Sequence, residues 1–268
     1  MAQSESLLTS HTIPDSLRAN ANAVVRYNAV TIEIKAYNKM LYTNKRIVTI
    51  LNSSGNSKNG AYMSYDNGVN IKQLEAKIYN ANGKEIKKIR KNDFEDVSAV
   101  DGGTLYSDSR VKYLNYTPID YPYTILFETE VEYSNTAYVP SWMPIEGYYI
   151  GVENSSYKFL FDPTVNIKKI ENNFKGYNII NNSIEGELKY EAHNIQGVSQ
   201  EAFSPPFDEF APLLNVALQN FYYEGYQGNT DDWKSLGKWM YDNLLVSREV
   251  VSESTKQTVL KLVEGIDD

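Results

Sequence analysis

Hydrophobic and polar residues alternate along much of the first two hundred positions, which is the pattern of strands with one buried face. The alternation begins at Ala23, and residues 41–51 repeat it with several β-branched side chains. The polar stretch 52–60 predicts a loop, so the strands before and after it suit an antiparallel pair.

Further strands are predicted as far as residue 192. Residues 71–79 and 84–89 flank Asn82-Gly83, and this dipeptide favours a type I′ hairpin turn because both residues tolerate positive φ. Segments of the same character follow at residues 111–116, 123–133, 157–161, 165–170, 179–180 and 187–192. Many short strands separated by Gly, Asn and Pro, with no helix between them, predict an antiparallel β-sandwich.

The pattern changes after residue 204. Pro205 and Pro206 cannot continue a central strand, and residues 210–220 predict either a short helix or an extended segment. Two amphipathic helices are predicted to follow, so the fold class is mainly β with a short C-terminal helical segment. The predicted divisions are a loosely held polar leader (1–22), a β-sandwich domain (23–204), and a linker with helices (205–268).

Each predicted helix has candidate caps and one apolar face. Asn229 or Thr230 is expected to cap the first helix, and Ser252 or Ser254 the second. The apolar faces consist of Trp233, Leu236, Met240 and Leu244, with Trp239 beside them, and of Val259, Leu262, Val263 and Ile266. Short helices need such faces to be covered, so we expect them to pack on the sandwich or on a partner beyond Asp268.

Composition narrows the class of protein. Hydrophobic residues make up 42% of the 268 residues, which is enough for a substantial core, and the net charge of −8 argues against nucleic acid as a partner. No apolar run is long enough to span a membrane. The start Met1-Ala2-Gln3-Ser4 is typical of a mature N-terminus left by signal peptidase, with a start Met added. We therefore expect an exported protein, periplasmic or at the cell surface, whose signal peptide has been removed. A natural cytosolic N-terminus is the alternative.

Few residues offer chemistry. The chain has no cysteine, which excludes disulfides, thiolate metal sites and a cysteine nucleophile within it. His11 lies in the polar leader and His193 is expected on a turn or the surface, so we predict no catalytic residue, no metal site and no cofactor. Asp66-Asn67-Gly68 and Asp101-Gly102-Gly103 favour Asx-Gly turns over calcium loops, while a carboxylate pair for sugar hydrolysis stays open.

Two segments are candidates for binding. Within residues 138–149, Trp142, Tyr148 and Tyr149 are the predicted ligand-binding residues, because aromatic faces stack on sugar rings or hold peptides. The alternative is that these large side chains fill the core or an interface. The basic run 84–91 is interpreted as a half-buried strand whose lysines deter edge-to-edge pairing, with a binding patch as the alternative.

Several of these strands also resemble a known family. The segments are IYNANGK (78–84) leading to Asp93-Phe94, YSDSRVKYL (106–114), Pro118, and YTILFETEVEY (123–133). Together they resemble the domain of unknown function that precedes transglutaminase-like domains in exported bacterial proteins, over residues 23–203. The resemblance implies a β-sandwich followed by a papain-like core with a Cys-His-Asp triad, and residues 233–268 resemble the first helices of that core. Because the chain has no cysteine, no catalytic residue can be carried over to it.

Three functions are possible hypotheses. The first is a non-catalytic module that positions or recruits partners or substrate for a transglutaminase- or protease-like domain absent from this chain, which would be its intramolecular partner. Its other partner would be a protein or a cell-envelope polymer. The second is a carbohydrate-binding or carbohydrate-active protein of the cell envelope, and the third is a structural assembly module that docks its helices on another chain.

Overall fold

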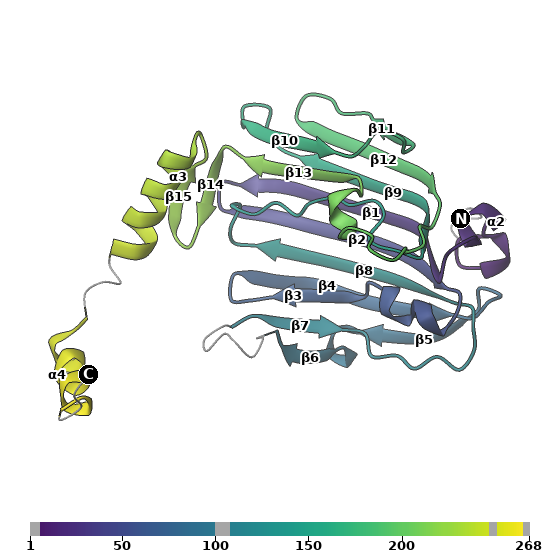
Figure 1. Cartoon of the computed structure of the whole chain (residues 1–268), viewed down its shortest axis with the longest axis horizontal. Helices are drawn as coiled ribbons and strands as arrows, with labels where there is room; N and C mark the ends of the chain where they lie inside the picture. The colour runs from purple at the N-terminus through teal and green to yellow at the C-terminus, as the bar shows by residue number, and fades with distance from the viewer. Residues whose placement is uncertain (1–5, 100–107, 247–250, 265–268) are drawn as a thin grey trace.

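The computed structural model describes residues 6–99, 108–246 and 251–264 (Figure 1). Strands hold 46% of the residues and helices 18%, so the predicted mainly-β class with short C-terminal helices is confirmed. No helix within those three ranges is long and apolar enough to cross a bilayer.

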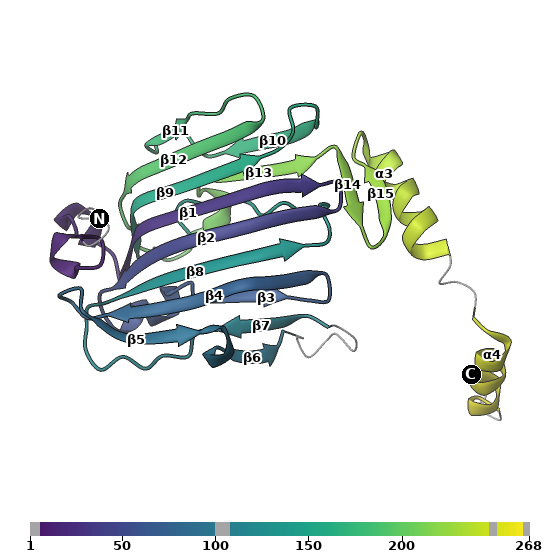
Figure 2. The same ribbon diagram turned by 180° about the vertical axis from the view of Figure 1, so that it is seen from behind.

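One large sheet of eight strands forms the body of the molecule (Figures 1 and 2). Its spatial order is β11-β12-β9-β1-β2-β8-β4-β5. The bounds are β1 (Ala23–Ala36), β2 (Lys39–Ile50), β4 (Val69–Tyr79), β5 (Glu85–Arg90), β8 (Tyr123–Tyr133), β9 (Ile150–Leu160), β11 (Ile179–Asn181) and β12 (Glu187–Ile195). Neighbouring strands are antiparallel except β1 and β9, which run parallel.

A second layer faces this sheet in two separate parts, one toward each end (Figure 1). One part is the three-stranded sheet of β3 (Tyr62–Tyr65), β7 (Arg110–Tyr113) and β6 (Glu95–Ser98), and the other pairs β10 (Ile167–Asn172) with β13 (Leu213–Leu218). The core lies between the layers. Val30 and Ile32 of β1 and Leu214 and Val216 of β13 all belong to its main cluster of buried side chains, which is how a sandwich buries one face of each sheet.

The hairpin predicted at Asn82-Gly83 is present, but its turn type is different. Gly83 has φ +78°, whereas Asn82 is not among the residues with positive φ, so the turn is not type I′. The amide of Gly83 donates to the carbonyl of Asn80 at 2.9 Å, and the amide of Asn80 donates to that of Lys84 at 3.0 Å. This is a three-residue loop with glycine at its left-handed position. As predicted for the basic run, β5 is an edge strand, with Ile89 buried and Ile86 exposed.

The N-terminal segment is anchored, not loosely held as predicted for the leader. It contains η1 (Ser10–Thr12) and α2 (Asp15–Arg18), and Ile13 and Leu17 are buried against Val24. Arg26 is only 1% exposed, and its guanidinium donates to Glu153 at 2.5 Å and to the carbonyl of Thr9 at 2.8 Å. A buried cation thus ties the segment to β1 and β9.

The chain beyond residue 204 contributes strands as well as helices. Most of residues 210–220 lies in β13 (Leu213–Leu218), so the extended alternative is the one that occurs. The remaining elements here are η4 (Phe207–Glu209), β14 (Asn220–Tyr223), β15 (Tyr226–Asn229), α3 (Trp233–Met240), the π-helical turn η5 (Tyr241–Leu245) and α4 (Glu253–Leu262), while η2 (Ser53–Lys58) and η3 (Lys91–Asp93) are 3-10 turns within the sandwich. Because β13 pairs with β10, the sandwich core extends past the predicted boundary.

Candidate functional site

Trp142, the first predicted ligand-binding residue, lies in the core. It is 2% exposed, and its ring packs on Tyr157 and Tyr190 with centroids 6.3 and 6.1 Å away. Its indole Nε1 donates to Oγ of Ser155 at 3.0 Å, and its backbone forms an isolated bridge with Leu214 of β13. The ring therefore offers no face to solvent, as the core-filling alternative expects.

Tyr148 and Tyr149 are half-buried and do not join Trp142 in one surface. The hydroxyl of Tyr148 donates to the carbonyl of Pro205 at 3.1 Å, and its ring lies 4.9 Å from that of Phe207. Tyr149 adopts φ +61° and donates to the carbonyl of Gln200 at 3.4 Å. Both side chains hold the segment after β12 against the body, and a ligand-binding role for them stays a prediction.

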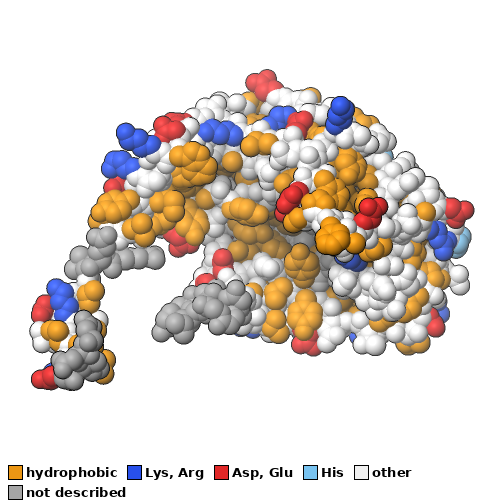
Figure 3. Space-filling view, viewed as in Figure 1, with side chains coloured by type: hydrophobic (Ala, Val, Ile, Leu, Met, Phe, Trp, Pro, Cys, Tyr) orange, Lys and Arg blue, Asp and Glu red, His pale blue; other side chains and the backbone are white. Residues whose placement is uncertain are grey.

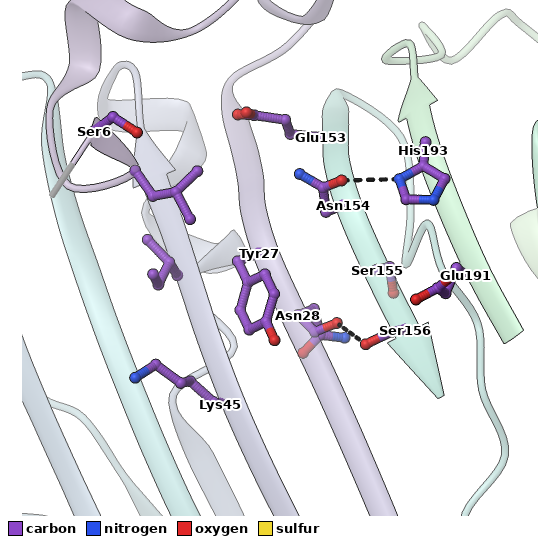
Figure 4. Close-up of a pocket in the computed structure, with 12 residues that line it drawn as sticks. Ser6, Tyr27, Asn28, Lys45, Glu153, Asn154, Ser155, Ser156, Glu191 and His193 are labelled. Atoms are coloured by element: carbon purple, nitrogen blue, oxygen red, sulfur yellow. Dashed lines mark hydrogen bonds between the residues drawn. The ribbon is translucent and has the colours of Figure 1, made fainter. Parts of the chain in front are cut away.

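A polar hollow of about 680 Å³ lies beside the N-terminal segment, on the side of the large sheet that faces away from the second layer (Figure 4). Its lining includes Tyr27, Ser156 and His193, from β1, β9 and β12. Ser156 and His193 stand next to the core residues Tyr157 and Ala192 in their strands. Because side chains alternate along a strand, they point away from the core.

The polar groups of this outer hollow bond to one another. Nδ1 of His193 lies 2.9 Å from Oδ1 of Asn154, and Oγ of Ser156 donates to the carbonyl of Asn28 at 3.5 Å (Figure 4). Glu191 accepts from Asn182 at 3.0 Å. A serine nucleophile needs a base within hydrogen-bond reach, whereas the hydroxyl of Ser156 points to a backbone carbonyl. The arrangement suits binding of a polar ligand better than covalent catalysis.

The Asx-turn interpretation holds at one of its two sites. The amide of Gly68 donates to Oδ1 of Asp66 at 2.8 Å, which is the bond of an Asx turn. Asp101-Gly102-Gly103 lies outside the described residues.

The first terminal helix, α3, is fixed to the hairpin of β14 and β15. Its cap is Asp232, whose Oδ1 accepts from the amide of Ser235 at 2.6 Å, so the prediction of Asn229 or Thr230 is wrong. That hydrogen bond holds the pKa of Asp232 below its ordinary value. The ring of Trp239 packs edge-on against Phe221 with centroids 4.8 Å apart. One tryptophan thus anchors α3.

The second terminal helix, α4, is not buried by any part of the chain that the structure describes. Ser252 caps it through the amide of Thr255 at 3.2 Å, which confirms one of the two predicted caps. All residues from 251 to 264 are exposed, among them Leu260 at 59% and Leu262 at 73%. Figure 1 shows α4 away from both sheets. Within the described ranges the sandwich does not supply the surface for this apolar face, and Ile266 lies outside those ranges.

The sequence matches the family described as "Domain of Unknown Function with solved-structure structure (DUF3857)" over residues 36–198. The chain belongs to this family. The resemblance seen in the strands is thereby confirmed. None of the curated proteins matches the sequence.

One solved structure of a longer protein has a similar fold. A structure from Parabacteroides distasonis described as a "putative protease" aligns with a TM-score of 0.62 at 15% identity, covering 92% of this chain and 47% of that one. The chain therefore spans about half the length of that protein, and the likeness is one of fold. Yeast LTA4 hydrolase aligns with a TM-score of 0.34 at 6% identity, covering 74% of this chain and 29% of that one. An M1 zinc metallopeptidase from Deinococcus radiodurans gives 0.30 at 8%, covering 73% and 42%.

The DUF3857 match ends at residue 198, before β13 and the terminal helices. Those later elements divide into two groups: β13 completes the sandwich core through Leu214 and Val216, while α3 and α4 stay outside it. Sequence reasoning missed two buried arginines, Arg26 and Arg46, which are 1% and 4% exposed. Each lies two positions from a buried residue of its strand, Val24 and Val48 respectively, and that spacing was the available signal.

Proposed function

We propose that this chain is a non-catalytic β-sandwich module that positions or recruits substrate or partners for a transglutaminase- or protease-like domain of the same exported protein. The observation that carries the proposal is the uncovered apolar face of the terminal helices. Trp233 is 88% exposed and Leu262 is 73% exposed. Burying a side chain of this kind contributes about 1.5–3 kcal/mol, so a covering domain would gain substantially from contact with the helices.

The side chains available in the chain favour a non-catalytic role. It contains no cysteine, and His193 is engaged with the amide of Asn154. The reactive groups would come from the neighbouring domain. The likeness to a protein about twice as long, described as a "putative protease", is in keeping with such a neighbour. The recruited partner would be a protein or a cell-envelope polymer, met in the periplasm or at the cell surface.

Hydrogen exchange tests the proposal. The exchange of backbone amides in α3 and α4 would be measured in this chain alone and in a longer protein that carries the following domain. We expect the amides of residues 253–262 to exchange rapidly in the chain alone and to gain at least about tenfold protection in the longer protein. Equal exchange in both proteins would refute the docking of a domain on these helices. Turnover of amide substrates by the chain alone would refute its non-catalytic role.

The polar hollow of Figure 4 favours carbohydrate binding as a second candidate function. Tyr27 offers an aromatic ring there, and the amide of Asn154 and the imidazole of His193 offer hydrogen bonds. A glycan array with the wild type and with Tyr27→Ala and His193→Ala tests this. Binding that both variants lose supports the candidate, and no glycan bound by the wild type rejects it. Trp142→Ala is unsuitable, because it would remove a core side chain.

A further inference from the structure

A second hollow, of about 330 Å³, opens on the face of the large sheet that carries the second layer. It lies beside β3, a strand of one part of that layer. Its floor comes from β2 and β8, with Tyr42, Asn44 and Arg46 on β2. Tyr62 of β3 lines one side and Tyr138 the other. Figure 3, which looks onto this face, shows hydrophobic side chains gathered around the recess.

Three of the five N–H donors of Arg46, which lines this inner hollow, have no partner in the described part of the chain. The side chain is 5% exposed, and Nη1 donates to Oε1 of Glu146 at 2.9 Å. Nε and Nη2 are buried and have no hydrogen-bond partner among the residues that the structure describes. These two atoms form one edge of the guanidinium, and that edge binds a planar pair of oxygens side-on.

Gly60 lies close to the guanidinium of Arg46. It has φ +64°, and a Cβ built on it would come within 2.8 Å of Nε of Arg46. Any other residue at this position would therefore crowd the guanidinium as well as strain the backbone. Glycine at residue 60 thus allows the backbone to lie close to the guanidinium of Arg46.

Asn44, two residues before Arg46 on β2, offers a hydrogen-bond acceptor where Arg46 offers donors. Its Nδ2 donates to Oδ1 of Asn28 at 3.1 Å, whereas its Oδ1 is buried and without a donor in the described part of the chain. Asn44 and Arg46 point to the same face of β2, with their Cα atoms about 6.7 Å apart. A ligand that satisfies both must present an oxygen pair and an N–H at that spacing.

The charges favour a carboxylate over a phosphate as the oxygen pair. Glu146 already shares the guanidinium of Arg46, and a dianion beside it would meet stronger repulsion than a monoanion. The two tyrosines of the rim, Tyr62 and Tyr138, are 60% and 70% exposed and offer apolar faces to the rest of the ligand. The end of a polypeptide combines a carboxylate, an amide N–H and a side chain.

We propose that the inner hollow binds the free C-terminus of a peptide. The Nε–Nη2 edge of Arg46 holds the carboxylate, Oδ1 of Asn44 accepts a backbone N–H, and Tyr62 and Tyr138 flank the last side chains. A volume of about 330 Å³ suits one or two residues. The site stands on the geometry of β2 and is independent of the proposed role of the terminal helices.

Calorimetric titration of the whole chain with matched small probes tests the ligand class. The probes are N-acetyl-alanyl-alanine, its C-terminal amide, acetate and inorganic phosphate. We expect the free acid to bind at least about tenfold more tightly than the amide, because the amide replaces one acceptor oxygen by a donor. Acetate should compete weakly. Equal binding of acid and amide, tighter binding of phosphate, or no saturable binding of the acid would each overturn the proposal.

Substitutions test whether the peptide acid binds in the inner hollow. Arg46→Lys keeps the charge but loses the two-donor edge, and should weaken binding of the acid about tenfold. Arg110→Lys is the matched control, because Arg110 is exposed and paired with Asp96 away from the hollow; it should change nothing. Tyr62→Ala alters an exposed side chain, and should weaken binding about threefold without affecting folding. If Arg46→Lys fails to fold, unchanged affinity in Tyr62→Ala would overturn the assignment.

Discussion

The two ends of the described chain reverse what their sequences predict. The N-terminal segment is short and polar, yet Leu17 is fully buried and the segment is tied to the sheet by Arg26. The C-terminal helices have regular apolar faces, yet every residue from 251 to 264 is exposed. An apolar pattern therefore indicates that a segment is stabilised by burial. It does not show whether the fold supplies the surface that buries it.

The difference lies in the surfaces available to each end. The start of β1 presents Val24 beside the N-terminal segment, and the buried guanidinium of Arg26 gives that segment's carbonyls a donor. The hairpin of β14 and β15 contacts α3 through Phe221 and the carbonyl of Gln227, and both meet Trp239. The described N-terminal segment is thus buried against the sheet, whereas the described residues of α4 are exposed.

Removing the side chain of Arg26 should cause the largest loss of stability at the N-terminal end. Arg26→Ala leaves the carboxylate of Glu153, which is 20% exposed, without the guanidinium, and removes one of the two donors to the carbonyl of Thr9. We expect the free energy of unfolding to fall by about 3–5 kcal/mol, measured by urea denaturation. The exposed Arg18→Ala in the same segment is the control, with a change within about 0.5 kcal/mol. A loss below about 1 kcal/mol for Arg26→Ala would contradict the anchoring role.

A matched pair of leucines sharpens the contrast between the ends. Leu17→Ala empties a fully buried site and should lower the free energy of unfolding by about 3 kcal/mol. Leu262→Ala changes a side chain that is 73% exposed and should stay within about 0.5 kcal/mol of the wild type. Thermal and urea unfolding of both variants measure the difference. Similar losses in the two would mean that α4 is covered in solution.

Substitutions of two tryptophans distinguish the anchored side of α3 from its exposed side. Trp239→Ala removes the ring contact with Phe221 and the hydrogen bond from Nε1 to the carbonyl of Gln227. We expect the local stability of α3 to fall by about 1–2 kcal/mol, seen as faster amide exchange in α3 with an unchanged melting temperature of the sandwich. Trp233→Ala, at an 88% exposed position, should leave that exchange unaltered. Equal effects of the two substitutions would deny Trp239 its anchoring role.

The sequence predicted what depends on local periodicity and missed what depends on distant partners. Alternation located β1, β2, β4 and β8, because each buries one face. The parallel pairing of β1 with β9 could not be read from either strand, because it joins residues more than a hundred positions apart. The sequence left open whether Trp142 binds a ligand or fills the core, and its burial depends on contacts such as the backbone bridge to Leu214, 72 residues away.

The same limit applies to the two buried arginines. Arg26 bonds to Glu153, 127 residues away, and Arg46 to Glu146, 100 residues away. A buried arginine is recognised only when its counter-charge is known, since charged residues are almost never buried unless paired. The lining of the inner hollow therefore became visible only through the fold, although the alternation along β2 already placed Asn44 and Arg46 on one face.

The smallest expected effect is a pH dependence confined to α3. Because the amide of Ser235 bonds to the carboxylate of Asp232, the pKa of this group in the folded helix lies below its ordinary value of 3.8. A lowered folded pKa means that the cap stabilises α3 above pH 3.8 and that this contribution is lost as the pH falls through the lower, folded value. Amide exchange of α3 between neutral and acidic pH measures the loss. Asp232→Asn provides the control, because asparagine caps equally well without titrating; an identical pH dependence in that variant would assign the effect to another group.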